Sequence, residues 1–136
     1  INFMMEDALS FDGNTGPYAQ YTYARTGSIL EKAGNIAELP PVITAPEEQA
    51  LLLTLARFPE KVLEALEAYE PSVVTRYILD VATAFNRFYH NCSILTESDP
   101  EIVATRVALA KATKTILGTA FELICMKKMT VVLLNR

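Results

Sequence analysis

The sequence has little of what catalytic and metal sites are usually built from. It contains one histidine, His90, and it has no glycine-flanked serine elbow, no HExxH motif and no Gly-rich phosphate loop. Cys92 and Cys125 stand far apart without a CxxC or Cys/His cluster, so they predict buried thiols in a reducing cytosol. The turn at residues 13–16 lacks the lysine of a phosphate-binding loop. We therefore expect neither a catalytic site nor a metal in this chain.

Long apolar runs are also absent. No segment reaches the roughly 18 to 20 uninterrupted apolar residues that a membrane span requires. The chain does not begin with a basic region followed by an apolar core. We expect a cytoplasmic protein with no membrane partner. Because the first residue is Ile1 and not methionine, we also expect a fragment of a longer protein.

The sequence has fewer basic than acidic residues. Lysine and arginine together number 12 against 16 aspartates and glutamates, which gives a net charge of −4. This balance does not favour wholesale attraction to a phosphate backbone, and we expect no DNA partner. A structured RNA remains compatible, because stacking and a local basic face can hold it while the other surface is acidic.

What the sequence does contain is a set of amphipathic segments separated by proline and glycine. Hydrophobic residues make up 51% of the 136 residues, enough for one buried core. The expected helices are residues 17–33, 46–57, 59–70, 73–92 and 100–126. Gly34 offers a left-handed stop, Ser72 and Asp99 are expected as N-caps, and the second helix is expected to be short and buried. The predicted fold is an all-α bundle of about five helices, mostly antiparallel to their neighbours.

The last segment has two unusual features. Gly118 lies inside the expected helix and predicts a close helix crossing or a bend, since glycine costs about 1 kcal/mol relative to alanine there. The apolar, β-branched end of the chain is compatible with a short strand, a docked tail or a frayed terminus. We accordingly divide the chain into an entry loop (1–16), a helical domain (17–126) and a tail (127–136).

The segment 84–92 is denser in aromatic and hydrogen-bonding side chains than a core needs. Helical spacing turns four residues inward and sets three others along an adjoining side. The inward set is Phe85, Phe88, Tyr89 and Cys92, and the adjoining set is Asn86, Arg87 and His90. The adjoining side has the donors and planar groups that suit unstacked bases, with a solvated helix side as the alternative.

Other aromatic and basic residues allow two interpretations each. Tyr18 and Tyr21 share a helical face, for which core packing is favoured over base stacking, while Tyr23 points elsewhere. Lys111 and Lys114 share a face of the last helix, and Arg106 lies some way round it. Such a set is usually a solvated face, with phosphate tracking as the alternative.

Three stretches carry a resemblance to a known family. They are ALSFDGNTGPYAQYTYAR at residues 8–25, AFNRFYHNC at 84–92 and RVALAKAT at 106–113. Together they resemble the class I arginyl-tRNA synthetases, over about residues 1–125. The first is similar to the junction where the catalytic domain passes into the helical domain, and the second to the signature of the DALR-type anticodon-binding domain of class Ia aminoacyl-tRNA synthetases.

The resemblance implies that catalysis and tRNA binding reside in different domains of a larger enzyme. The parent enzyme would join arginine to its tRNA with ATP and Mg, in a catalytic domain upstream of this chain, and this part would hold the anticodon stem-loop of tRNA-Arg without a cofactor of its own. The implied tRNA-binding candidates are Phe85, Arg87, Tyr89 and His90, which would pack the anticodon platform or touch its bases, with Arg25 at the stem. Lys111 and Lys114 complete the candidates as phosphate contacts.

The tail departs from the family pattern, which ends in a Gly-containing turn and a Pro-Glu-Arg-Met-like terminus. Residues 125–136 have neither. The main alternative function is a helical protein-interaction module whose aromatic face binds a protein and no RNA, which the acidic balance favours. A small standalone helical enzyme has almost no support.

Overall fold

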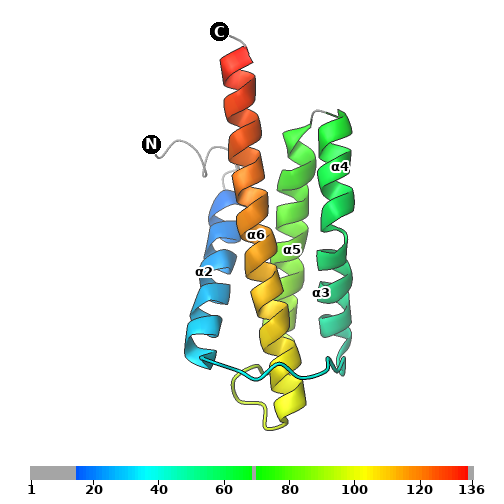
Figure 1. Cartoon of the computed structure of the whole chain (residues 1–136), viewed down its shortest axis with the longest axis vertical. Helices are drawn as coiled ribbons and strands as arrows, with labels where there is room; N and C mark the ends of the chain where they lie inside the picture. The colour runs from blue at the N-terminus through cyan, green and yellow to red at the C-terminus, as the bar shows by residue number, and fades with distance from the viewer. Residues whose placement is uncertain (1–14, 69, 135–136) are drawn as a thin grey trace.

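The computed structural model describes residues 15–68 and 70–134, with the side chains of 16–68 and 70–125. The expected entry loop therefore lies almost wholly outside the described residues. The described part is all-α, as predicted, and contains no strand (Figure 1). Its helices are α2 (Thr15–Ala33), α3 (Pro46–Ala56), α4 (Phe58–Ala68), α5 (Pro71–Asn91) and α6 (Pro100–Leu134).

Two of the predicted helix ends are confirmed in detail. Gly34 has a φ of 65°, and its N–H donates to the carbonyl of Leu30 at 3.1 Å, which closes α2 with the left-handed residue that glycine allows. Asp99 Oδ1 accepts the N–H of Glu101 at 2.9 Å and so caps α6 ahead of Pro100. Both ends follow from local chemistry alone.

Other ends differ from the prediction. The N-cap of α5 is Glu70 and not Ser72, because Pro71, with its fixed φ and missing N–H, takes the first helical position. The Ser72 hydroxyl instead donates to Glu70 Oε2 at 2.6 Å. α2 begins at Thr15 instead of residue 17. α6 does not stop at 126 but continues as helix to Leu134, since its β-branched residues each cost only a few tenths of a kcal/mol in a helix.

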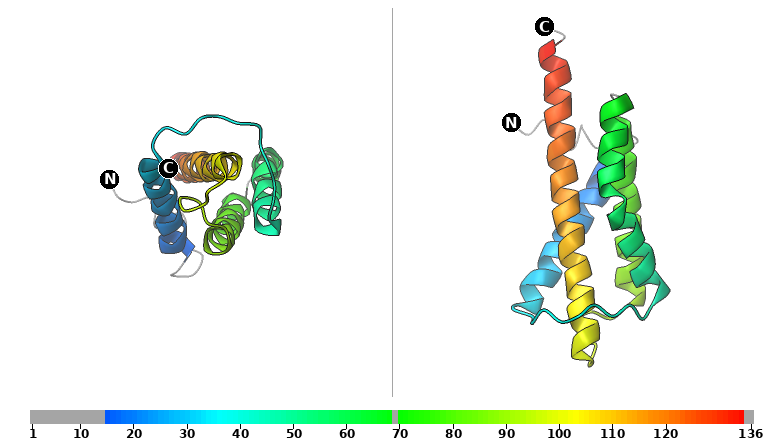
Figure 2. Two further views of the ribbon diagram at one scale, coloured as in Figure 1. Left: turned by 90° about the horizontal axis from the view of Figure 1, so that it is seen from below. Right: turned by 45° about the vertical axis from the view of Figure 1, so that its right-hand side comes forward.

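The helices pack side by side around one core (Figure 2). α3 and α4 lie end to end, and both pack against α5. The segment 34–45 crosses α6 at the end of the bundle, where the Val42 N–H donates to Thr105 Oγ1 at 2.9 Å. This crossing makes α2 and α5 parallel neighbours, whereas α6 runs antiparallel to both (Figure 1).

At the break between α3 and α4, a buried tyrosine donates hydrogen bonds to backbone carbonyls of α3. Pro59 has no N–H, so the carbonyl of Leu55 lacks its usual helical donor four residues further on. The hydroxyl of Tyr77 on α5 donates to this carbonyl at 3.2 Å and to that of Thr54 at 2.8 Å. Burial raises the pKa of Tyr77 to about 12, so the donor proton stays in place.

Helix α3 is less buried than predicted. Its inward side consists of Glu48, Leu51 and Leu55, whereas Leu52 and Leu53 are 44% and 59% exposed. A helix at the edge of a bundle packs only one of its faces against the core. Apolar residues on its other faces therefore remain exposed to solvent.

Gly118 lies on the side of α6 that meets α2, beside the Tyr23 ring. A Cβ at this position would lie 3.4 Å from Cε2 of Tyr23, which is an ordinary van der Waals contact. The Tyr23 ring packs edge-on against Phe121, with 5.7 Å between centroids. A close crossing or a bend at Gly118 therefore stays a prediction, because a Cβ would also fit here.

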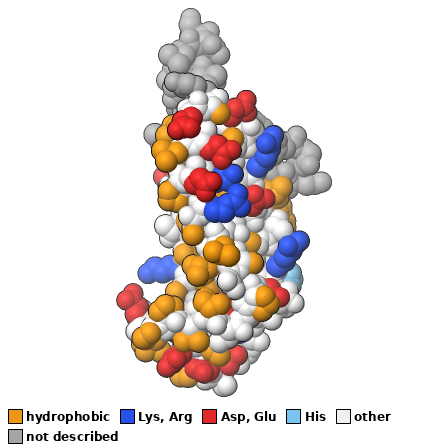
Figure 3. Space-filling view, turned by 90° about the vertical axis from the view of Figure 1, so that its right-hand side faces the viewer, with side chains coloured by type: hydrophobic (Ala, Val, Ile, Leu, Met, Phe, Trp, Pro, Cys, Tyr) orange, Lys and Arg blue, Asp and Glu red, His pale blue; other side chains and the backbone are white. Residues whose placement is uncertain are grey.

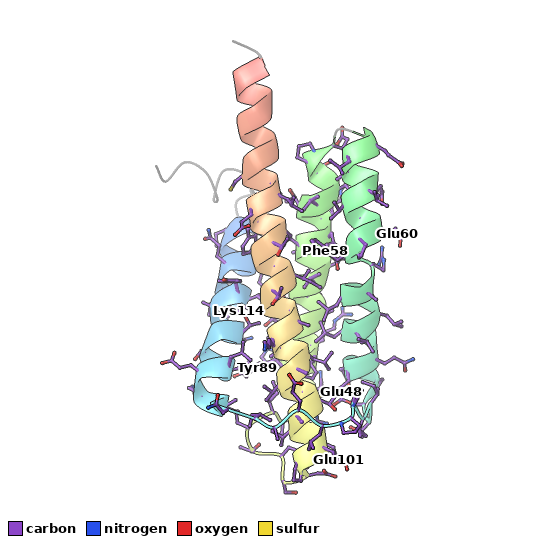
Figure 4. All side chains as sticks on the ribbon, in the orientation of Figure 1. Glu48, Phe58, Glu60, Tyr89, Glu101 and Lys114 are labelled. Atoms are coloured by element: carbon purple, nitrogen blue, oxygen red, sulfur yellow. The ribbon has the colours of Figure 1, made fainter. Side chains whose placement is uncertain are left out.

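A buried ion pair joins α3 to α6. Glu48 is fully buried and Arg106 is 8% exposed, and Arg106 Nε donates to Glu48 Oε2 at 2.7 Å. The other carboxylate oxygen, Oε1, accepts the N–H groups of Thr44 and Ala45 at 2.6 and 2.8 Å (Figure 4 labels Glu48). Arg106 also donates to the carbonyl of Ser93 at 2.5 Å. The prediction that Arg106 belongs to a solvated face is therefore wrong.

The charge of Glu48 is held by its partners. Burial by itself raises the pKa of this carboxyl, but the hydrogen bonds from Arg106 and from the backbone of Thr44 and Ala45, with the positive charge of Arg106, outweigh it and lower the pKa. The pair is consequently ionised in the folded protein at neutral pH.

Removing one partner of this pair should be costly. We expect Glu48→Ala to lower the free energy of unfolding by about 3 kcal/mol, near the lower end for a broken buried pair, because Arg106 would keep only its longer ion pair with Glu97, at 3.7 Å. The matched control is Glu64→Ala, which breaks the half-exposed pair with Lys61 and should cost about 1 kcal/mol or less. Urea unfolding at neutral pH measures both, and equal losses would contradict this role for Glu48.

The same pair predicts a pH dependence. Because the folded pKa of Glu48 lies below its ordinary value of 4.5, its stabilisation is complete above that value and is lost as pH falls through the folded pKa. The stability difference between wild type and Glu48→Gln should therefore shrink on acidification below about pH 4.5. A difference that stays constant from neutral pH to pH 3 would show that the carboxylate charge is not what stabilises the fold.

Candidate nucleic-acid interface

An arginine held between two tyrosines lies where α2 meets α5. The guanidinium carbon of Arg25 is 4.8 Å from the ring centroid of Tyr21 and 4.3 Å from that of Tyr89. Its Nη2 donates to the Tyr21 hydroxyl at 2.8 Å. Tyr21 is 58% exposed and Tyr89 is 38% exposed, so both rings face solvent as well as the cation. We call Tyr21, Arg25 and Tyr89 the Arg25 sandwich.

Helical spacing and a rigid support explain this arrangement. Tyr21 and Arg25 are four residues apart on α2, so they lie one above the other on one face. On α5, the Tyr89 ring stacks on Phe85, with 6.4 Å between centroids. Phe85 is fully buried in the core, and it therefore supports the sandwich from below but has no surface to offer a ligand.

A buried asparagine links the sandwich to the core. Asn86 is 8% exposed, and its Oδ1 accepts Arg25 Nη1 at 2.7 Å. Its Nδ2 donates to the Tyr18 hydroxyl at 3.0 Å and to Thr22 Oγ1 at 2.9 Å. These side-chain partners of an α5 residue all lie on α2. Asn86 lines the smaller hollow with Arg87 and His90, as expected, but unlike them it is almost fully buried.

Two open hollows lie on either side of the sandwich. Their volumes are about 620 and 480 Å³, and Tyr21, Arg25 and His90 line both. The larger also includes Lys32, and the smaller includes Arg87 and Asn91. No aspartate or glutamate of the described residues lines either one. We call this basic, aromatic surface the α2–α5 groove.

The structure brings some of the predicted residues together and separates others. Arg25, Arg87, Tyr89 and His90 all lie at the α2–α5 groove, where the rings of Tyr89 and His90 meet edge to face at 5.5 Å. Tyr89 is thus an exposed platform and not the inward residue that the spacing predicted.

The lysines of α6 lie elsewhere. Lys111 and Lys114 line a separate hollow of about 360 Å³ between α2 and α6, together with Tyr23 and Glu122. The Lys114 ammonium is 5.8 Å from the Tyr23 ring (Figure 4 labels Lys114 and Tyr89). They share a face, as predicted, but not the face of Arg25.

Sequence reasoning left Tyr21 out of the binding candidates. Core packing was favoured for it over base stacking, yet its ring is mostly exposed. Its spacing from Arg25 was the available signal, because an aromatic and an arginine four residues apart on a helix stack readily. Helical spacing placed Asn86 beside Arg87 and His90 but gave no signal for its bonds to α2, since those partners are more than 60 positions away in the sequence.

Three further properties of the described residues concern thiol reactivity, metal binding and membrane spanning. Burial raises the pKa of the Cys92 thiol, which keeps it in the protonated and less reactive form, and its inward direction is as predicted. Among the described residues no three metal-ligating side chains gather into a group. Nor does any described helix have the length and apolarity to cross a membrane.

Comparisons with known proteins all find similarity to one domain family and to one kind of tRNA ligase. A family model described as the DALR anticodon binding domain matches residues 19–131. An arginine--tRNA ligase of Treponema pallidum is 40% identical over 131 residues, which is 90% of this chain and 22% of that protein. One from Clostridium perfringens is 44% identical over 128 residues, or 91% of this chain and 23% of that protein.

A solved structure agrees with these relatives. The arginyl-tRNA synthetase of Thermus thermophilus superposes with a TM-score of 0.75 at 37% identity, covering 85% of this chain and 21% of that one. The chain thus spans less than a quarter of the length of the proteins that it matches.

Proposed function

Because this chain belongs to the DALR anticodon binding domain family, we propose that its α2–α5 groove holds the anticodon stem-loop of tRNA-Arg within an arginine--tRNA ligase. The resemblance to arginyl-tRNA synthetases seen in the sequence is confirmed by the relatives. The observation that carries the proposal is the Arg25 sandwich, a half-buried cation between two exposed rings in a groove that no described acidic side chain lines.

The groove has the chemistry that unstacked RNA bases need. Every base has a π-face, and the Tyr21 ring, 58% exposed, offers surface for stacking beside Arg25. The Tyr89 ring packs against Phe85 and Arg25 and offers its exposed part to a base. Arg25 uses two of its N–H groups on described residues and has others to donate to a base edge or a phosphate. Arg87 and His90 are exposed beside it and add further donors.

The negative net charge does not oppose this proposal, because no acidic side chain of the described residues lines the groove. The α4 side of the molecule carries Glu60, Glu64, Glu67 and Glu70, and acidic side chains are prominent on that face in Figure 3. A local field set by Arg25, Lys32 and Arg87 can attract RNA to one side while the acidic side faces away.

Lys111 and Lys114 would act as phosphate contacts on the neighbouring side of α2. The nearby carboxylate of Glu122 weakens the field of that hollow, so we assign them a smaller role than Arg25. A contact with phosphate alone changes affinity without changing base preference.

We assign the chemical reaction to the remainder of the protein. Arginylation with ATP and Mg²⁺ would take place in a catalytic domain outside this chain, which we propose as its covalent partner in the cytoplasm. The described residues offer no group of carboxylates for Mg²⁺. The task of this domain would be to bind and orient the tRNA.

Anticodon recognition can be tested directly. The chain should bind tRNA-Arg more tightly than the same tRNA with substituted anticodon bases, and the preference should persist across a salt series in which both affinities fall. Fluorescence anisotropy with labelled tRNA measures this. Equal affinity for the two tRNAs, or no binding, would sink the proposal, and the exposed leucines of α3 and α4 would then favour the protein-interaction alternative.

Single substitutions locate the binding face. Tyr89→Ala should weaken binding of tRNA-Arg by about 1 to 3 kcal/mol if a base stacks on the ring, and Arg87→Ala should weaken it as well. The matched control is Arg76→Ala, since Arg76 is exposed on the same helix three turns away. A loss of affinity with Arg76→Ala as large as that with Arg87→Ala would mean that charge, and not the groove, drives binding.

The α6 lysines should give a different signature. Replacing Lys111 and Lys114 together with alanine should reduce the magnitude of the salt slope by about 0.7 to 0.9 for each phosphate that the two side chains neutralise. The ratio of affinities for tRNA-Arg and the anticodon-substituted tRNA should stay the same. An unchanged salt slope would remove these lysines from the interface.

A further inference from the structure

We propose that Asn86 is a positioning residue for RNA binding, which holds the Arg25 guanidinium between the rings of Tyr21 and Tyr89 before the RNA arrives. This inference rests on the proposed function of the α2–α5 groove and adds the mechanism by which its central cation is oriented. Asn86 borders the smaller hollow but is only 8% exposed, so it offers the RNA little surface of its own.

The hydrogen bonds of Asn86 allow one orientation of its amide. Oδ1 accepts from Arg25, and Nδ2 meets two hydroxyl oxygens that can accept, those of Tyr18 and Thr22. The reverse orientation would point the NH₂ group at the guanidinium, which has donors only. The acceptor for Arg25 is therefore fixed from the other side of the amide, above all by the fully buried Thr22.

Two anchors then define where the guanidinium lies. Nη1 is bound by Asn86 from α5 and Nη2 by the Tyr21 hydroxyl from α2. Because the guanidinium is planar, two bonds on different nitrogens fix its plane as well as its place. The stacking rings limit the remaining freedom.

This pre-orientation should improve affinity. A free arginine side chain loses rotamer entropy when it is immobilised by a ligand, and a side chain already held in place loses less. Asn86, at 8% exposure, thus acts on RNA mainly through Arg25. A purely structural asparagine would affect the stability of the fold but not the mobility of Arg25.

The first experiment examines the free protein and needs no RNA. In NMR spectra of arginine side-chain N–H groups, a held Arg25 should give separate, slowly exchanging Nη signals. Asn86→Ala should merge or broaden them, and Asn86→Asp should restore them, because a carboxylate still accepts from Arg25 while the Tyr18 hydroxyl turns to donate. Arg25 signals that are the same in wild type and Asn86→Ala would overturn the inference.

The control for lost stability is Thr75→Ala. Thr75 is also buried and polar on α5, but its hydroxyl donates at 3.2 Å to Pro71 of its own helix, three turns from Asn86. Both alanine variants should lower Tm, yet only Asn86→Ala should alter the Arg25 signals. If Thr75→Ala alters them equally, the effect is a general loosening of the bundle and the positioning role fails.

The second experiment is a binding cycle with tRNA-Arg. Arg25→Ala and Asn86→Ala should each raise Kd by about tenfold, the size expected for one immobilised side chain. The double variant should bind no more weakly than Arg25→Ala alone. Effects that multiply would show that Asn86 acts independently of Arg25. If wild type binds no RNA, the proposed function fails, and the Arg25 signals alone then decide whether Asn86 positions this side chain.

Discussion

The ion pair between Glu48 and Arg106 joins the parts of the bundle that the chain itself leaves far apart. Its carboxylate caps the start of α3 and its guanidinium reaches the loop between α5 and α6, so one pair secures the crossing segment 34–45 and the base of α6 together. Burying two charges is costly unless their hydrogen bonds are satisfied. Here the described partners satisfy both carboxylate oxygens, and no buried side-chain polar atom of the described residues lacks a partner.

The crossing segment has a consequence for the groove. Because it carries the chain across α6 before α3 begins, α2 and α5 become parallel neighbours instead of being separated by the next helix. Tyr21 and Arg25 then face Tyr89 and Asn86, although the two pairs lie more than 60 positions apart. The basic, aromatic surface proposed to bind RNA is thus a product of topology.

The charged residues are unevenly distributed between the groove and the rest of the surface. Ion pairing removes Arg106 from the surface, and the basic residues that remain at the groove meet no acidic side chain of the described residues there. An overall charge of −4 is therefore compatible with a positive local field. Net charge constrains the whole surface, whereas binding depends on one side of it.

Local patterns suffice to predict the helical class, the stop at Gly34, the cap at Asp99 and the family resemblance, because caps, glycine and motifs act over a few neighbouring residues. They also place Arg25, Arg87, Tyr89 and His90 among the binding candidates. The burial of Arg106 and Asn86, the exposure of Tyr21 and the separate side occupied by the α6 lysines follow instead from how the helices pack. Helical period assigns a residue to a face, but burial of that face depends on a distant segment packing against it.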